Sequence, residues 1–199
     1  MVIPWIWLAG LVAVMALSAA LTGCARRYAL RRNLMDQPGE RRSHGVATPR
    51  GGGIAIVATL LLACLAAALI WPSAAKALLV FAIGLGMVAG IGWWDDHHPL
   101  PALRRLLVHL VASALLAGLV WQVTGNLVQS VLALLFTVSL VNIWNFMDGI
   151  NGIATTQAIL AAMAFSLVLP SPFGLAGVVL GLACLGFLPF NFPQARIFM

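Results

Sequence analysis

Long apolar runs separated by short polar segments make up most of the chain. Several runs reach the ~20 residues that a helix needs to cross the hydrocarbon core of a bilayer. None alternates with the period of two that a membrane β-barrel strand requires. The pattern predicts seven helices, at roughly 3–24, 53–71, 77–94, 103–121, 127–146, 153–169 and 174–190. We therefore predict an all-α fold, a polytopic transmembrane helix bundle that forms one integral membrane domain over residues 1–199.

Composition supports the same class. Of the 199 residues, 62% are hydrophobic and only 8% are charged, a balance that a soluble domain could not solvate. The three cysteines lie in or at the ends of apolar runs without the spacing of metal ligands, which favours a packing role. The "LTGC" at Leu21–Cys24 is similar to a bacterial lipoprotein cleavage box, but no positive region precedes the apolar run.

The basic residues predict the orientation of the helices. Of the eleven lysines and arginines, all but Lys76 fall in segments that seven alternating helices place on one side of the membrane. The positive-inside rule makes that side cytoplasmic and places the N-terminus on the other, periplasmic side. The predicted cytoplasmic segments are about 25–52, 95–103, 147–152 and 191–199.

All five acidic residues fall on the predicted cytoplasmic side, in loops or at helix ends: Asp36, Glu40, Asp95, Asp96 and Asp148. Carboxylates near a membrane are costly and often mark a functional site. The adjacent Asp95 and Asp96 in "GWWDDHHPL" repel each other unless a cation or a shared proton relieves the repulsion. Ordinary helix-end polarity would explain Asp36 and Glu40 more readily than this pair.

Asp148 interrupts some of the most apolar sequence in the chain, at "NIWNFMDGINGIA". Asn142, Asn145 and Asp148 recur every three residues, which predicts a polar ladder at the end of the fifth helix. Gly149 and Gly152 would then let the backbone turn and approach a ligand closely. Packing between membrane helices alone would explain the asparagines but not the carboxylate.

A basic loop, "RRSHGVATPRGGGIAI", adds the third candidate element. Its glycines precede a helix, and backbone N–H groups at a helix N-terminus, together with arginine, suit a phosphate. It is not a Walker motif, because no Lys-Ser/Thr pair follows the glycines. A polybasic patch on anionic lipid is the alternative interpretation. Basic residues combined with carboxylates predict an anionic substrate bridged by a divalent cation, as in phosphoryl transfer.

Four segments in order resemble the polyprenyl-phosphate N-acetylhexosamine-1-phosphate transferases of glycosyltransferase family 4: "DQPGERRSHGVATPRGGG", "GWWDDHHPLPALRRL", "NIWNFMDGINGIA" and "FLPFNFPQARIFM". This family includes the phospho-N-acetylmuramoyl-pentapeptide translocase, and the third segment is most similar to the O-antigen-initiating type. The resemblance implies transfer of N-acetylhexosamine-1-phosphate from a UDP-sugar to polyprenyl (undecaprenyl) phosphate with release of UMP. Such a reaction would initiate a lipid-linked cell-surface polysaccharide, such as that of lipopolysaccharide, at the cytoplasmic face of a bacterial inner membrane.

The same resemblance implies roles for individual residues. Three aspartates would be catalytic and would bind Mg²⁺, with Mn²⁺ as an alternative: Asp95, Asp96 and Asp148. Five further residues would bind the substrate: His44, Arg50, Arg105, Asn142 and Asn145. The implied partners are a UDP-N-acetylhexosamine, polyprenyl phosphate and membrane lipid, with no nucleic acid, and a homodimer is allowed.

Two departures from the family pattern affect these expectations. Asn151 stands where members of the family often have a second aspartate. Members also continue beyond the fourth segment with a further aspartate, a His-rich loop and more helices. The 199-residue chain is therefore expected to insert in the membrane but to be inactive alone. A transporter or channel and a non-catalytic membrane scaffold are the alternatives, although transport favours carboxylates near mid-membrane rather than at one face.

The topology makes a first prediction. Asp95, Asp96, Asp148 and Arg50 should all face the cytoplasm, because alternating helices and the positive-inside rule place their segments there. Single cysteines at these positions, in a Cys-free background, should be labelled by a membrane-impermeant maleimide in inverted vesicles but not in spheroplasts. Labelling of position 95 from the periplasmic side alone would contradict the topology.

Overall fold

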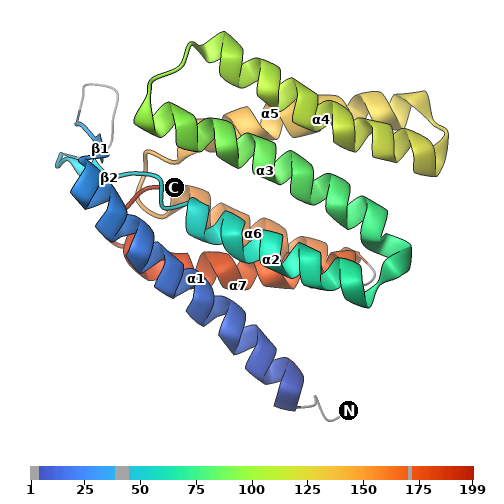
Figure 1. Cartoon of the computed structure of the whole chain (residues 1–199), viewed down its shortest axis with the longest axis horizontal. Coiled ribbons are helices and arrows are strands. Elements are labelled where there is room, and N and C mark those ends of the chain that lie inside the picture. The colour runs from blue at the N-terminus through green and yellow to red at the C-terminus, as the bar shows by residue number, and fades with distance from the viewer. Residues whose placement is uncertain (1–4, 39–44, 170–171) are drawn as a thin grey trace. The chain divides into compact units, whose positions relative to one another are not determined.

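The structure is a computed structural model, and it describes residues 5–38, 45–169 and 172–199. Over these residues the chain is nearly all helical (Figure 1). The helices are α1 (Trp5–Arg32), α2 (Ile54–Ile70), α3 (Ala75–His97), α4 (Ala102–Thr124), α5 (Leu127–Met147), α6 (Ile153–Val168) and α7 (Phe173–Asn191). Five of them are long and apolar enough to cross a membrane, whereas α2 and α6 are shorter apolar helices. The predicted class, a polytopic helical membrane protein, is confirmed.

Helices α1 and α3 extend beyond their predicted ends into charged sequence. α1 continues past residue 24 to Arg32, since arginine is a good helix former and basic side chains at a helix C-terminus favour the helix dipole. α3 continues to His97 and therefore includes Asp95 and Asp96 in its last turns. The aspartate pair is thus held on a helix rather than in a loop, which fixes its backbone.

A short antiparallel pairing occurs within the basic loop, where the sequence predicted no regular structure. Strand β1 (Met35–Asp36) pairs with strand β2 (Thr48–Pro49), with Met35 opposite Pro49 and Asp36 opposite Thr48. The pairing brings the two ends of the loop together directly after α1 and before α2.

The chain forms two compact units. The first unit comprises Met1–Ala63 and Asp148–Met199, and so combines both ends of the sequence. Within it, α7 packs against α6 and against α1, which lies beside it in Figure 1. The second unit is the continuous stretch Cys64–Met147, in which α4 packs against α3 and α5.

The core of the first unit lies along α7. Phe187 and Ala183 are completely buried, and the Ser18 hydroxyl of α1 donates a hydrogen bond of 2.7 Å to the Ala183 carbonyl. Gly186 allows α1 to approach closely, because a Cβ atom there would overlap the carbonyl oxygen of Met15. Small residues and interhelical hydrogen bonds of this kind are the usual means of packing helices in a bilayer.

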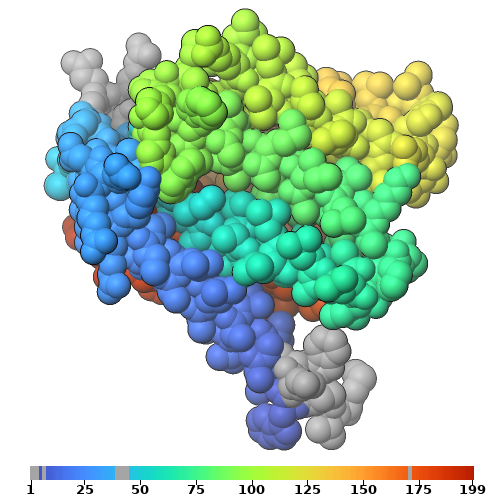
Figure 2. Space-filling view, viewed as in Figure 1, coloured from blue at the N-terminus to red at the C-terminus, as the bar shows by residue number. Residues whose placement is uncertain are grey.

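The second unit exposes much of its apolar surface. The space-filling view shows α4, light green to yellow, at the surface (Figure 2). Several of its large apolar side chains are exposed, such as Leu107 at 52% and Val111 at 52%. Leu103 on α4 and Phe136 on α5 are 66% and 63% exposed. In water such a surface would be unfavourable, but hydrocarbon can cover it at no cost.

The contact at Gly186 gives a second prediction. Gly186→Ala should destabilise the protein by about 1–3 kcal/mol, because the new methyl group must push α1 away from α7. Gly181→Ala, on the same helix, is the matched control, because its Cβ would meet only the Ala162 methyl at an ordinary 3.6 Å. Thermal unfolding in detergent should show a lower midpoint for the first variant only, and equal midpoints would contradict the close packing of α1 on α7.

Candidate functional site

Asp95 is held firmly at the end of α3, in the second unit, by contacts with the connection to α4 and with α4 itself. Its Oδ2 atom forms an ion pair of 2.9 Å with Nη1 of Arg105, and its Oδ1 atom accepts the N–H of Leu100 at 2.7 Å. The Asp95 and Arg105 side chains are 22% and 32% exposed. The structure thus brings together two residues that the sequence analysis assigned to one site. Asp96 follows in the same turn of α3 and is half-buried.

A buried histidine extends this polar region. His109 lies one turn after Arg105 on α4 and is only 7% exposed, and Asn142 of α5 is a polar neighbour. Asn142 donates from Nδ2 to the Val138 carbonyl at 2.7 Å. The sequence analysis missed His109. Its position four residues after Arg105, on an otherwise apolar helix, was the available signal.

The predicted polar ladder is only partly helical. Asn142 and Asn145 both lie in α5, but this helix ends at Met147, so Asp148 is the first residue of the turn that follows. Asn145 is exposed, whereas Asn142 and Asp148 are half-buried. The carboxylate therefore takes its orientation from the turn and from its partners in the first unit, rather than from the helical spacing.

In the first unit, three segments that are distant in sequence meet around Asp148. The carboxylate accepts the N–H of Met199 at 3.1 Å. The Met199 carbonyl in turn accepts the N–H of Gly51 at 3.3 Å, and the Phe198 carbonyl accepts that of Gly52 at 2.8 Å. We call residues 49–53, 148–155 and 191–199 the three-segment cluster. The cluster so defined includes Arg50, which is half-buried and belongs to the same unit as Asp148.

Two N–H groups of the glycine loop are used within the protein. Those of Gly51 and Gly52 bond to the backbone carbonyls of Met199 and Phe198, so the predicted phosphate binding by this loop would fall to its other groups. A Cβ atom at Gly52 would lie 2.7 Å from the ring of Phe187 and 2.8 Å from the Phe198 oxygen. Glycine is required here for the approach of another chain segment. His44, the other predicted phosphate ligand of this loop, lies outside the described residues.

Of the two glycines predicted to allow a turn and a close approach after Asp148, Gly152 does so. Gly152 has a φ of 73°, and a Cβ atom there would lie 2.9 Å from the ring of Phe192. Within the described residues, Gly149 shows neither a positive φ nor a close neighbour. The close approach at Gly152 is to the protein's own segment after α7.

The donor chemistry of the aspartates fits a hard divalent cation. Mg²⁺ prefers carboxylate oxygens and is commonly bound by one or two carboxylates together with substrate phosphates. Among the residues that the structure describes, no three His, Cys, Asp or Glu side chains gather closely enough to hold a metal by themselves. Both oxygens of Asp95 already accept hydrogen bonds, from the Leu100 N–H and from Arg105.

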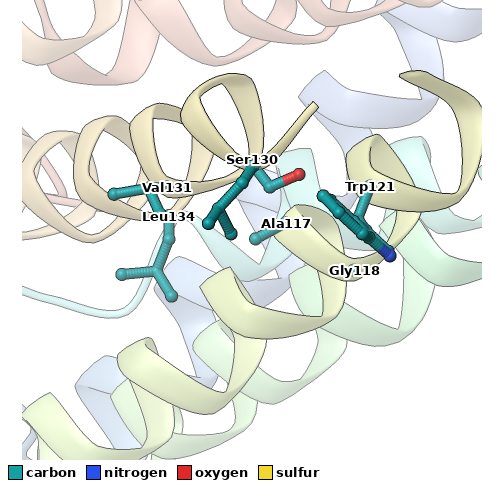
Figure 3. Close-up of a pocket in the computed structure, with 7 residues that line it drawn as sticks. Ala117, Gly118, Trp121, Ser130, Val131 and Leu134 are labelled. Carbon is teal, nitrogen blue, oxygen red and sulfur yellow. The ribbon is translucent and has the colours of Figure 1, made fainter. Parts of the chain in front are cut away.

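An apolar hollow lies between α4 and α5, towards their ends remote from Arg105 (Figure 3). It measures about 240 Å³ and is lined by Ala117, Gly118, Trp121, Leu127, Ser130, Val131 and Leu134. Figure 3 labels lining residues from both helices, and the Ser130 hydroxyl donates to the Asn126 carbonyl at 3.0 Å. Its lining offers no charged group for a phosphate.

The fold and these polar clusters define a multi-pass helical membrane protein with carboxylates and basic side chains held at helix ends. Residues 77–199 match the profile described as Glycosyl transferase family 4, and the chain belongs to this family. The matched range includes the aspartate pair, the Asp148 turn and the segment after α7.

Several relatives of this chain are sugar-phosphate transferases. The chain is 34% identical to the decaprenyl-phosphate N-acetylglucosaminephosphotransferase of Mycobacterium tuberculosis, over 94% of this chain and 55% of the relative. It is 29% identical to the phospho-N-acetylmuramoyl-pentapeptide-transferase of Thermosynechococcus vestitus, over 99% and 58%. It is 25% identical to the undecaprenyl-phosphate alpha-N-acetylglucosaminyl 1-phosphate transferase of Thermotoga maritima, over 92% and 56%. The chain thus spans little more than half the length of these relatives.

The turn between α3 and α4 gives a third prediction. Asp95→Asn and Arg105→Gln should each lower stability, but the double variant should lose about 1 kcal/mol less than the sum, because both changes break the same ion pair. Asp95→Leu should cost more than Asp95→Asn, since it also leaves the Leu100 N–H without its acceptor. Chemical unfolding in detergent measures all four variants, and strict additivity would contradict a stabilising pair.

Proposed function

We propose that the protein transfers an N-acetylhexosamine-1-phosphate from a UDP-sugar to polyprenyl phosphate, releasing UMP. The main support is the family match over residues 77–199, which contains Asp95, Asp96 and Asp148. Two of the relatives named above are N-acetylglucosamine-phosphate transferases, which favours N-acetylglucosamine as the sugar. The family membership also favours this enzyme over the transporter and the scaffold that the sequence left open.

The proposed reaction exchanges one phosphoanhydride bond for another. An oxygen of the lipid phosphate forms a bond to the β-phosphorus of the UDP-sugar, and the bond from that phosphorus to the bridging oxygen breaks. UMP leaves with the bridging oxygen, and the product is a polyprenyl-diphosphate-sugar. Little covalent chemistry falls to the protein, which must instead position the phosphates and stabilise their charge.

The described side chains divide these tasks. Arg105 and the Leu100 N–H hold Asp95 in one orientation. We therefore assign Asp95 a positioning role, in which it holds the C-terminal end of α3 against the N-terminal end of α4. Asp96 would act on the attacking lipid phosphate. Arg50 in the three-segment cluster would bind a phosphate, and Asp148 would orient the nucleotide. Asn142 and Asn145 would contribute polar contacts to the substrate.

Mg²⁺, with Mn²⁺ as an alternative, would be held by carboxylates of this set and would offset the negative charge of the diphosphate. We place the site at the cytoplasmic face of a bacterial inner membrane, where the basic segments lie by the positive-inside rule. The product would start a lipid-linked polysaccharide of the cell surface, of which O-antigen is one example.

The fourth prediction tests this assignment. In the purified protein, at the full length that its gene encodes, Asp96→Asn and Asp148→Asn should each lower kcat by about 10²–10³-fold, the usual cost of removing a positioned electrostatic group. The protein should stay folded, because both carboxylates are only half-buried and lie at helix ends. Asn151→Asp is the control and should change kcat little, because Asn151 is exposed.

The assay supplies labelled UDP-N-acetylglucosamine, Mg²⁺ and undecaprenyl phosphate and measures the lipid-linked product. UDP-N-acetylgalactosamine in a parallel reaction reports the choice of sugar. Near-normal transfer by both aspartate variants would contradict the residue roles. Absence of product from the unmodified protein with every N-acetylhexosamine donor would contradict the function itself.

A further inference from the structure

Asn191, the last residue of α7, is a buried polar side chain to which the sequence analysis assigned no role. Only 1% of it is exposed. Its Oδ1 atom accepts the N–H of Gly152 at 3.0 Å and the hydroxyl of Thr155 at 2.9 Å. Its Nδ2 atom donates to the Ile197 carbonyl at 3.1 Å. A backbone N–H can only donate and a carbonyl can only accept, so these partners fix which way the amide points.

These bonds complete a closed path around Asp148. The turn leads from Asp148 to Gly152, whose N–H reaches Asn191. From Asn191 the path passes to Ile197 and along the chain to Met199, whose N–H returns to the Asp148 carboxylate. Asn191 is therefore the point where the turn after α5 and the segment after α7 are joined by side-chain bonds in buried surroundings.

We propose that Asn191 is a positioning residue, which holds the Asp148 turn against residues 197–199 and so fixes the direction of the Asp148 carboxylate. The inference rests on the proposed function, in which Asp148 orients the nucleotide. Asn191 itself would touch no substrate, because its oxygen and its amide nitrogen are bonded within the protein and the side chain is buried. Its effect on the reaction would pass entirely through the geometry of the turn.

Neighbouring threonines supply matched variants. Thr155→Val removes one of the two bonds to the Asn191 oxygen without changing the shape of the side chain, whereas Thr155→Ser keeps the hydroxyl. Thr156→Val is the matched control, since it makes the same chemical change at the next residue. The Thr156 hydroxyl donates to the nearby backbone carbonyls of Gly152 and Ile153 and not to Asn191. Asn191→Leu removes all three bonds at once.

Hydrogen exchange tests the contacts without any assay of activity. In Asn191→Leu the Gly152 amide should exchange at least about tenfold faster, because it loses its acceptor, and in Thr155→Val about threefold faster. Thr155→Ser and Thr156→Val should exchange as the unmodified protein does. If Asn191→Leu does not fold, the exchange rate of the Gly152 amide in Thr155→Val is compared with that in Thr156→Val, and this comparison tests the same network. Unchanged exchange at Gly152 would overturn the proposed network.

Enzyme kinetics, normalised to the amount of folded protein, test whether Asn191 affects catalysis. Thr155→Val and Asn191→Leu should lower kcat by about 10- to 100-fold while KM for the UDP-sugar changes by less than about threefold, because a misplaced carboxylate weakens the reaction more than binding. Thr155→Ser should restore kcat. A stabilising role alone would reduce the amount of folded protein but not kcat per folded molecule, and that result would overturn the positioning role.

The two measurements separate the possible failures. Faster exchange together with unchanged kcat would overturn the role of Asn191 and leave the proposed function standing. Absence of transfer by the unmodified protein would overturn the proposed function and the catalytic part of this proposal, while the exchange data would still report whether Asn191 holds the turn.

Discussion

Every polar group that enters an apolar environment must find a partner inside the protein, and this requirement shapes both units. Hydroxyl side chains on the apolar helices return their hydrogen bonds to backbone carbonyls, as Thr59 does to Ala55 and Ser113 to His109. At the helix ends, where water and lipid headgroups begin, the same requirement is met between segments. The N–H groups before α2 bond the carbonyls of residues 198 and 199. The polar clusters therefore form partly because backbone N–H and C=O groups need hydrogen-bond partners, and not only because a reaction needs polar side chains.

The hydrophobic pattern was sufficient to predict the class of fold and the number of helices over the described residues, because apolar runs of this length have few other uses. It was less informative about helix ends, where apolarity stops but helical backbone continues. α1 and α3 both continue into charged sequence, which placed Asp95 on a helix. The pairing of β1 with β2 leaves no alternating pattern in strands of two residues, so periodicity could not reveal it.

The candidate site was predictable as a set of residues but not as a set of contacts. The Asp95–Arg105 pair could be expected from two neighbouring helix ends, and it is present. The glycines before α2 were interpreted as phosphate-binding groups, because a sequence does not show which distant segment will use their N–H groups. Asn191 was overlooked for the same reason, since its partners Gly152 and Thr155 belong to the preceding helix and its turn. Family resemblance identified residue types, whereas long-range bonds determine what each one does.

The first unit combines two segments that are separated by the whole second unit in the sequence, and this has a consequence for biosynthesis. During translation, residues 64–147 emerge as one continuous stretch, and α3, α4 and α5 can pack as soon as they have been inserted. The first unit must wait, because Gly51 and Gly52 find their acceptors only when residues 198 and 199 leave the ribosome. Until then α1 and the loop before α2 are held in the membrane without their final partners. A ribosome that pauses after residue 147 but before residue 198 would therefore leave the second unit complete and the cluster around Asp148 still open.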